Sequence, residues 1–120
     1  AIERLVPRST DEIVRSFQRA GAHFMAGDLE KALESNQRSL MLNPRMVFGL
    51  KDRVIYLEKL GRRAEALMAL QETKAAWPGL TLEHVERLHI NSVLAPSVAQ
   101  DFFQTFAKVW HAAEEAEAKQ

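Results

Sequence analysis

The sequence predicts an all-α protein of about six helices that pair as antiparallel hairpins within 120 residues. Apolar residues recur along most of the chain at the three- and four-residue spacing of amphipathic helices. Single glycines fall between these apolar segments, where they end one helix before the next begins. A third observation, an internal repeat, indicates how the helices pair.

The repeat has a period of 34 residues and covers the first two thirds of the chain. The segment Gly27–Leu33 (GDLEKAL) is echoed by Gly61–Leu67 (GRRAEAL), and each runs on to a proline, Pro44 and then Pro78. Three independent landmarks, the glycine, the alanine after it and the proline, share this spacing. Such a period is typical of a helix hairpin that buries its apolar face by stacking on a neighbour.

At these positions the chain resembles the tetratricopeptide family. The family's small residues, turn glycine and closing proline are matched in the two copies by Ala20, Gly27, Ala32, Ser39 and Pro44, and by Val54, Gly61, Ala66, Thr73 and Pro78. The resemblance covers roughly residues 13 to 80. It departs from the family pattern at Ser16 with Leu50, and at Arg19 with Arg53. It implies an α–α superhelix whose concave groove is lined by the first helix of each unit.

The repeat also predicts the domain boundaries. An N-terminal arm, a helical domain and a frayed helical tail are expected at residues 1–8, 9–111 and 112–120. Two repeats and a pair of capping helices are expected within the domain at about 13–46, 47–80 and 81–111. No third repeat follows, because Ala95 and Gln100 stand where its glycine and alanine would recur. Since about three repeats are usual for stability, the last helices should close the stack.

Helix-start signals agree with this division. Ser9 with Glu12 three residues later predicts a capping box at the start of the first helix. Asp28 is placed to cap the second helix directly after its turn glycine. Asn43 and Pro44 predict the start of the third helix, as an N-cap followed by proline at the first helical position.

Beyond the repeat, Thr81 is expected to cap a short helix that ends near Ile90, and Pro96 to open a long one. The long helix carries an apolar stripe at helical spacing, made of Val98 or Ala99, Phe102, Phe103, Phe106, Val109 and Trp110. The adjacent phenylalanines lie about 100° apart around the helix, so both do not fit one buried face. Core packing is the favoured role of this stripe, with a ligand pocket as the alternative.

Charge and hydropathy exclude several classes of partner. The chain has 16 basic and 16 acidic residues with the two signs interspersed, so no clustered basic surface for nucleic acid is expected. No apolar run approaches the ~20 residues that span a bilayer, so no membrane partner is expected and the location is taken as cytoplasmic. The absence of cysteine excludes disulfides and thiolate chemistry.

No catalytic, cofactor or metal site is predicted. His84 and His89 are five residues apart, about 140° around a helix, and so do not share a face as metal ligands would. The glycines lie singly at turns or helix contacts and form no phosphate-binding loop. No nucleophile elbow occurs either. We therefore expect a chain that is not an enzyme.

The resemblance implies which residues line the groove. Carried over position by position, these are Val14, Phe17, Gln18, Phe24, Met25, Phe48, Lys51, Asp52, Ile55 and Lys59, with Gly21 and Glu58 beside them. Chaperone-binding members hold a carboxylate with Lys and Asn, but Phe17, Gly21 and Asp52 occupy those places here. The groove is therefore expected to favour an apolar or amphipathic segment, with its phenylalanines and Met25 as anchors.

The expected function is protein binding or scaffolding through this groove. Because the chain begins with alanine, it is interpreted as a piece of a longer protein, the regulatory part of one of bacterial type. The alternative is self-assembly into a homo-oligomer through the aromatic last helix or an open stack end. A sensor of apolar small ligands is a third hypothesis. A further alternative is that the capping helices or the arm fill the groove.

Overall fold

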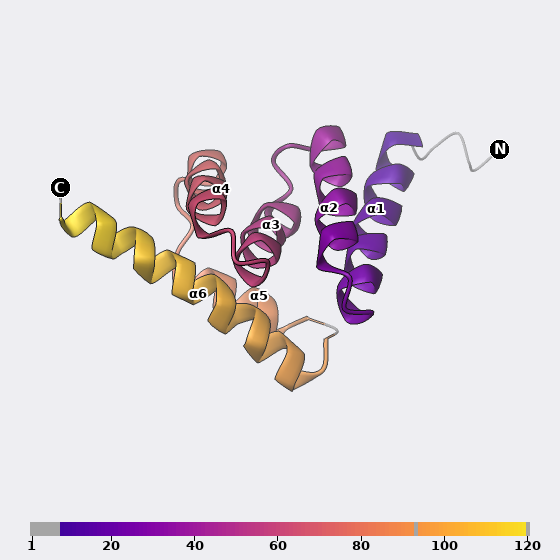
Figure 1. The fold of residues 1–120 in the computed structure, drawn as a ribbon. Helices are drawn as coiled ribbons and strands as arrows, with labels where there is room; N and C mark the ends of the chain where they lie inside the picture. The colour runs from indigo at the N-terminus through magenta and orange to yellow at the C-terminus, as the bar shows by residue number, and fades with distance from the viewer. Residues whose placement is uncertain (1–7, 93, 120) are drawn as a thin grey trace.

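The computed structural model describes residues 8–92 and 94–119, with side chains from residue 11 onward. These residues form six helices and no strand, which confirms the all-α prediction (Figure 1). The helices are α1 (Arg8–Met25), α2 (Leu29–Leu42), α3 (Val47–Lys59), α4 (Arg63–Ala76), α5 (Leu82–Ile90) and α6 (Pro96–Ala118).

The first four helices form two hairpins that stack side by side. α1 packs along α2, α3 packs along α4, and α2 joins the hairpins by packing on α3. The bounds of α4 lie 34 residues after those of α2 at both ends, so the sequence period is also a structural period. α6 runs across α3 and α4, and α5 packs mainly on α6 (Figure 1).

The turn glycines close α1 and α3 in the same way. Gly27 and Gly61 have positive φ angles of 83° and 76°, a conformation that other residues rarely adopt. In both turns the glycine N–H donates to the carbonyl oxygen three residues earlier, at 2.9 Å. The N–H of the next residue, Asp28 or Arg62, donates to the carbonyl five residues before it, at 2.8 and 3.0 Å. This pattern is the Schellman motif, which strongly favours glycine at that point.

The predicted caps are in part correct. The side chain of Asp28 accepts a hydrogen bond from the backbone of Lys31 at 3.1 Å, and Thr81 accepts one from His84 at 3.2 Å. Pro96 lies at the first turn of α6, as expected. The capping box prediction is wrong, because α1 begins at Arg8 and so already includes Ser9.

The prediction for Asn43 and Pro44 is wrong. Asn43 ends α2, where its N–H donates to the carbonyl of Ser39 at 2.9 Å, and α3 begins only at Val47. The residues between form a turn in which Met46 N–H donates to the Asn43 carbonyl at 3.3 Å. Asn followed by Pro is favoured at the first two positions of such a turn as well as at a helix start, and the turn prevails here.

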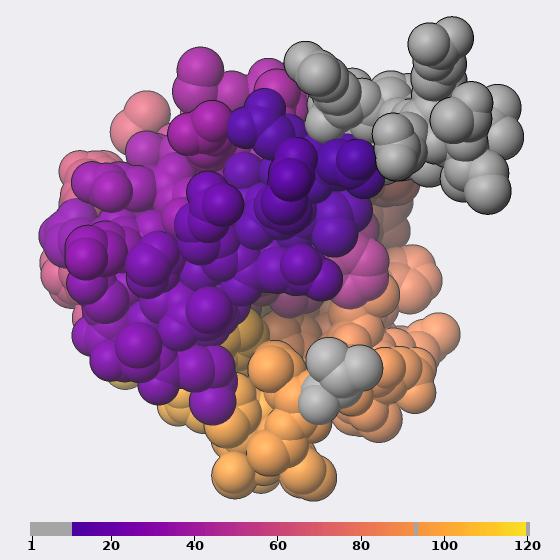
Figure 2. Space-filling model, turned by 90° about the vertical axis from the view of Figure 1, so that its right-hand side faces the viewer, coloured from indigo at the N-terminus to yellow at the C-terminus, as the bar shows by residue number. Residues whose placement is uncertain are grey.

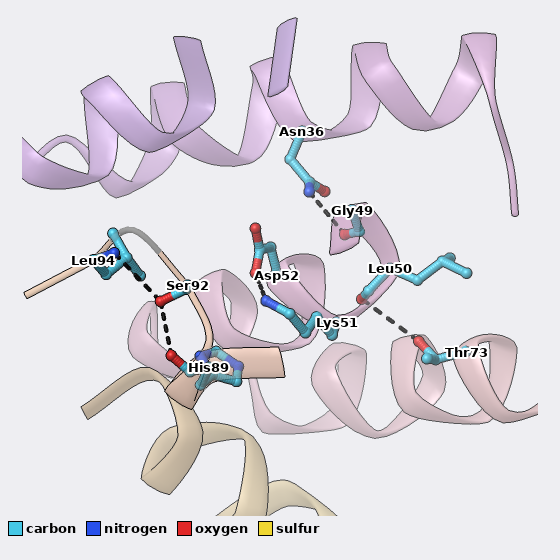
Figure 3. Close-up of polar contacts among 9 residues, drawn as sticks. All are labelled: Asn36, Gly49, Leu50, Lys51, Asp52, Thr73, His89, Ser92 and Leu94. Carbon is cyan, nitrogen blue, oxygen red and sulfur yellow. Dashed lines mark hydrogen bonds and ion pairs between the residues drawn. The ribbon is translucent and has the colours of Figure 1, made fainter. Parts of the chain in front are cut away.

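Small and polar residues let the helices approach closely. Ala32 and Ala66, the two equivalent alanines of the repeat, have no exposed surface. The Asn36 side chain of α2 donates to the backbone carbonyl of Gly49 in α3 at 2.9 Å (Figure 3). A Cβ atom at Gly49 would meet side-chain atoms of Met46 and Leu40 at 2.8 and 3.0 Å. A larger residue at this position would therefore require the Met46 and Leu40 side chains to shift where α2 crosses α3.

The aromatic stripe of α6 packs on the chain's own core. Phe102 and Phe106 are buried, and Phe103 and Trp110 are half-buried against the core. The ammonium group of Lys74 lies over the Trp110 ring, 4.0 Å from its centroid. The helix continues to Ala118, so the segment expected to fray is helical up to that residue.

α6 is the longest helix of the part of the chain described here. None of the helices in that part has the length and apolar character required to cross a bilayer.

Candidate binding groove

A pocket of about 480 Å³ opens between α1, α3, the end of α5 and the start of α6. We call it the groove. Its surface is mostly aromatic and aliphatic, and its polar side chains come from α1, α3, α5 and the turn after α5. Figure 2 looks onto α1 and shows the surface hollowed where α1, in indigo, faces the orange surface of α5 and α6.

The structure brings most of the predicted groove residues together. Those that line the groove are Phe17, Gln18, Phe24, Met25, Phe48, Lys51 and Asp52, with Gly21 beside them. Val14 lies on α1 outside the groove and is 48% exposed.

Two predicted residues, Ile55 and Lys59, do not line the groove. Ile55 has no exposed surface and belongs to the core. The Lys59 ammonium pairs with the carboxylate of Asp101 in α6 at 2.6 Å. The physical reason is that α6 crosses α3 and covers its C-terminal end. The capping helices therefore fill one end of the predicted groove and leave the other end open.

The floor of the groove is a cluster of aromatic rings. Phe24 meets Phe102 edge to face with ring centroids 4.5 Å apart, and Tyr56 lies 5.8 Å from Phe24. Such geometry adds roughly 0.5–1.5 kcal/mol per pair beyond the burial of area. Phe24 thus helps to hold α6 against α1 and α3, which limits its freedom to serve as an anchor for a partner.

The upper wall is more exposed. Phe48 is 44% exposed and packs edge to face on Phe17, with centroids 6.3 Å apart. Met25, at the end of α1, is 62% exposed. Phe48 and Met25 are therefore the groove's accessible apolar side chains.

A buried ion pair lies in the wall that α3 contributes. The Lys51 ammonium donates to the Asp52 carboxylate at 2.6 Å, and the two residues are only 5% and 6% exposed (Figure 3). Burial raises the pKa of Asp52, while the charge of Lys51 and its hydrogen bond act in the opposite direction. Sequence reasoning placed both residues in the groove but did not predict their burial, because the α5–α6 segment that covers them lies outside the repeat.

His89 of α5 also lines the groove, where the sequence did not place it. It is 3% exposed, and its ring lies 5.9 Å from that of Phe102 and 6.3 Å from that of Phe103. Within the described residues its Nε2 atom has no hydrogen-bond partner. Burial, with a smaller contribution from the charge of Lys51, lowers the pKa of His89 to about 3. The imidazole is therefore neutral at pH 7.

This neutral histidine predicts a pH-dependent stability. Because the pKa of His89 is about 3 when folded and about 6.5 when unfolded, the unfolded chain binds a proton that the folded chain does not. His89 should therefore remove up to about 1.4 kcal/mol of stability per pH unit as the pH falls from 6.5 towards 3. Urea unfolding of the wild type and of His89→Leu should show a shallower pH dependence for the variant across this window.

At pH 7.5 His89 is neutral in both the folded and the unfolded chain. Urea unfolding at that pH therefore measures only how His89→Leu changes the packing contribution to stability. Equal pH slopes for the two proteins between pH 6 and 4 would contradict a neutral buried His89.

The described residues offer no metal centre, since nowhere among them do three His, Asp or Glu side chains gather closely enough to hold an ion. His84 is exposed while His89 is buried, so the two histidines of α5 lie in different surroundings.

No protein-family model matches the chain, and no curated protein matches its sequence.

Proposed function

We propose that this chain is a protein-interaction module of the tetratricopeptide kind whose groove binds an apolar or amphipathic segment of a partner protein. The observation that carries the proposal is the groove itself, where exposed Phe48 and Met25 flank an aromatic floor. Accessible apolar side chains gathered in a concave site are typical of such interfaces. A scaffolding or regulatory role within a larger, cytoplasmic protein is part of the proposal.

The family assignment in this proposal rests on the period of the fold. α2 and α4 share their length and their 34-residue offset, and Gly27 and Gly61 make the same Schellman turn. Ala32 and Ala66 occupy equivalent buried positions at the helix contacts. These features support two tetratricopeptide units followed by a capping pair.

The polar groups of the groove favour binding over catalysis. Ser92 and His89 line the same pocket, but the Ser92 hydroxyl donates to the backbone carbonyl of His89 at 2.8 Å. It is therefore not aligned on the imidazole ring as an activated nucleophile would be. We accordingly propose a non-enzymatic function.

Self-assembly through the aromatic last helix is less well supported. Phe102 and Phe106 are buried in the chain's own core, and Phe103 and Trp110 are half-buried against it. An interface would need these rings on the surface. We therefore retain the groove as the proposed binding surface.

The test is to select binding segments and ask whether they need the groove. A displayed library of twelve-residue peptides would be selected on the wild-type chain, and the affinities of the selected peptides measured by titration calorimetry. Phe48→Ala should weaken binding about 10- to 100-fold, because a central aromatic anchor usually contributes about 2 kcal/mol or more. Phe48 is chosen because, unlike Phe24, it is exposed enough for its loss to leave the fold intact.

Met41→Ala is the matched control. Met41 is 83% exposed, lies on α2 outside the groove, and should not affect binding. Unchanged affinity for folded Phe48→Ala, or equal losses for the two variants, would reject the groove as the binding site.

A further inference from the structure

The buried ion pair in the groove has hydrogen-bonding capacity left over. A lysine ammonium group has three donors and a carboxylate has about four acceptor sites. Within the described residues, Lys51 and Asp52 use one of each, in the bond that joins them. Both side chains line the groove, and Figure 3 shows them on α3 on the side that faces the end of α5. Both residues are more than nine-tenths buried. A bound group would therefore make its polar contacts with their unused donors and acceptors.

The pair carries no net charge, and its neighbours do not change that balance. Burial and Lys51 keep His89 neutral. Arg87 lies at the rim, where its guanidinium is 3.7 Å from the carboxylate of Glu83. A charged group on a ligand would therefore bring an uncompensated charge into a buried site, which is costly. A neutral group that both donates and accepts a hydrogen bond suits the pair better.

The surroundings of the pair select an aromatic carrier for that group. The Lys51 ammonium lies over the Phe48 ring, 5.7 Å from its centroid, and Phe17 packs edge to face with that ring. Flat rings can add to such a cluster edge to face or with an offset. The pocket volume of about 480 Å³ accommodates one aromatic side chain with part of its backbone.

We propose that the groove recognises a tyrosine side chain of the partner segment. The phenol ring packs against Phe17 and Phe48, and its hydroxyl donates to Asp52 and accepts from Lys51. Phenylalanine would leave both hydrogen-bonding groups unfilled, and tryptophan has a donor but no acceptor. The inference rests on the proposed function, because it names the anchor residue of the segment that the groove would bind.

The test compares two small probes that differ by one hydroxyl group. N-acetyl-L-tyrosinamide and N-acetyl-L-phenylalaninamide would be titrated into the isotope-labelled chain and followed by amide NMR shifts. Both should shift groove resonances, and the tyrosine probe should bind about three- to tenfold more tightly, as one or two net hydrogen bonds allow. In the double variant Lys51→Met/Asp52→Leu this ratio should fall to about one.

Equal affinities in the wild type, a ratio that persists in the double variant, or the absence of groove shifts would each overturn the inference. Tighter binding of N-acetyl-L-glutamic acid amide would overturn it in favour of an anionic anchor. The wild-type ratio decides the matter even if the double variant fails to fold. Selected peptides that lack tyrosine but still depend on Phe48 would reject the tyrosine anchor and leave the interaction module standing.

Discussion

Replacing Phe106 with alanine is expected to lower the free energy of unfolding by about 3–5 kcal/mol. Phe106 has no exposed surface and lies in the middle of α6, with its ring 6.0 Å from that of Trp110. Its truncation leaves a cavity where α6 packs on the repeats, in addition to losing buried apolar area. Because α6 closes one end of the groove, the loss should also weaken the site.

Urea unfolding followed by circular dichroism measures this effect. Phe103→Ala is the matched control, since Phe103 is half-buried and only three residues away on the same helix. Phe103→Ala should lower the free energy of unfolding by clearly less than Phe106→Ala does. Similar costs for both substitutions would mean that α6 is not held on the stack by the face that carries Phe106.

The contrast between these phenylalanines shows what the sequence could predict. Helical spacing placed Phe102, Phe103 and Phe106 on one stripe, and the 100° between adjacent residues implied that they would not all be buried. Period alone does not determine which neighbour is buried. That depends on the angle at which α6 crosses α3, which is set by packing between elements distant in the sequence.

The groove was predictable to a similar extent. The repeat placed Phe17, Phe48 and the charged pair near one another, as they lie in the groove, because the stacking of two similar units fixes the relation of α1 to α3. The repeat contained no information on α5 and α6, which lie after it. Ile55 and Lys59 were therefore expected on an open surface that α6 in fact covers.

Ambiguous local signals explain the error at the second turn. Asn43 and Pro44 satisfy the chemistry of a helix start and of a β-turn equally well. The helix α2 must end and the chain must reverse direction before α3 can pack on α2. Asn43 and Pro44 therefore form a turn and not a helix start. Gly27 and Gly61 carried no such ambiguity, since a positive φ after a helix has few alternatives to glycine.

The buried ion pair leads to the second large effect. Lys51→Met is expected to destabilise the chain by about 3–5 kcal/mol, because it leaves the Asp52 carboxylate buried without its partner. Lys51→Met/Asp52→Leu should recover most of that loss, since two apolar side chains of suitable volume replace a pair whose burial is itself costly. The more exposed pair of Lys59 and Asp101 provides a control, and Lys59→Met should cost no more than about 1 kcal/mol.

The pH dependence of the single variant supplies an independent check. Burial raises the pKa of Asp52, and Lys51→Met removes both the charge and the hydrogen bond that oppose that rise. A carboxyl group whose folded pKa exceeds its unfolded value gains stability as the pH falls through the folded pKa. The loss of stability caused by Lys51→Met should therefore become smaller between pH 7 and pH 4, whereas that of the double variant should not change.

The measurement is urea unfolding at both pH values of the wild type, Lys51→Met, Asp52→Leu and the double variant, which together form a double-mutant cycle. Additive single effects with no pH dependence would mean that Lys51 and Asp52 are solvated separately, and the groove would then lack the neutral pair on which tyrosine recognition depends.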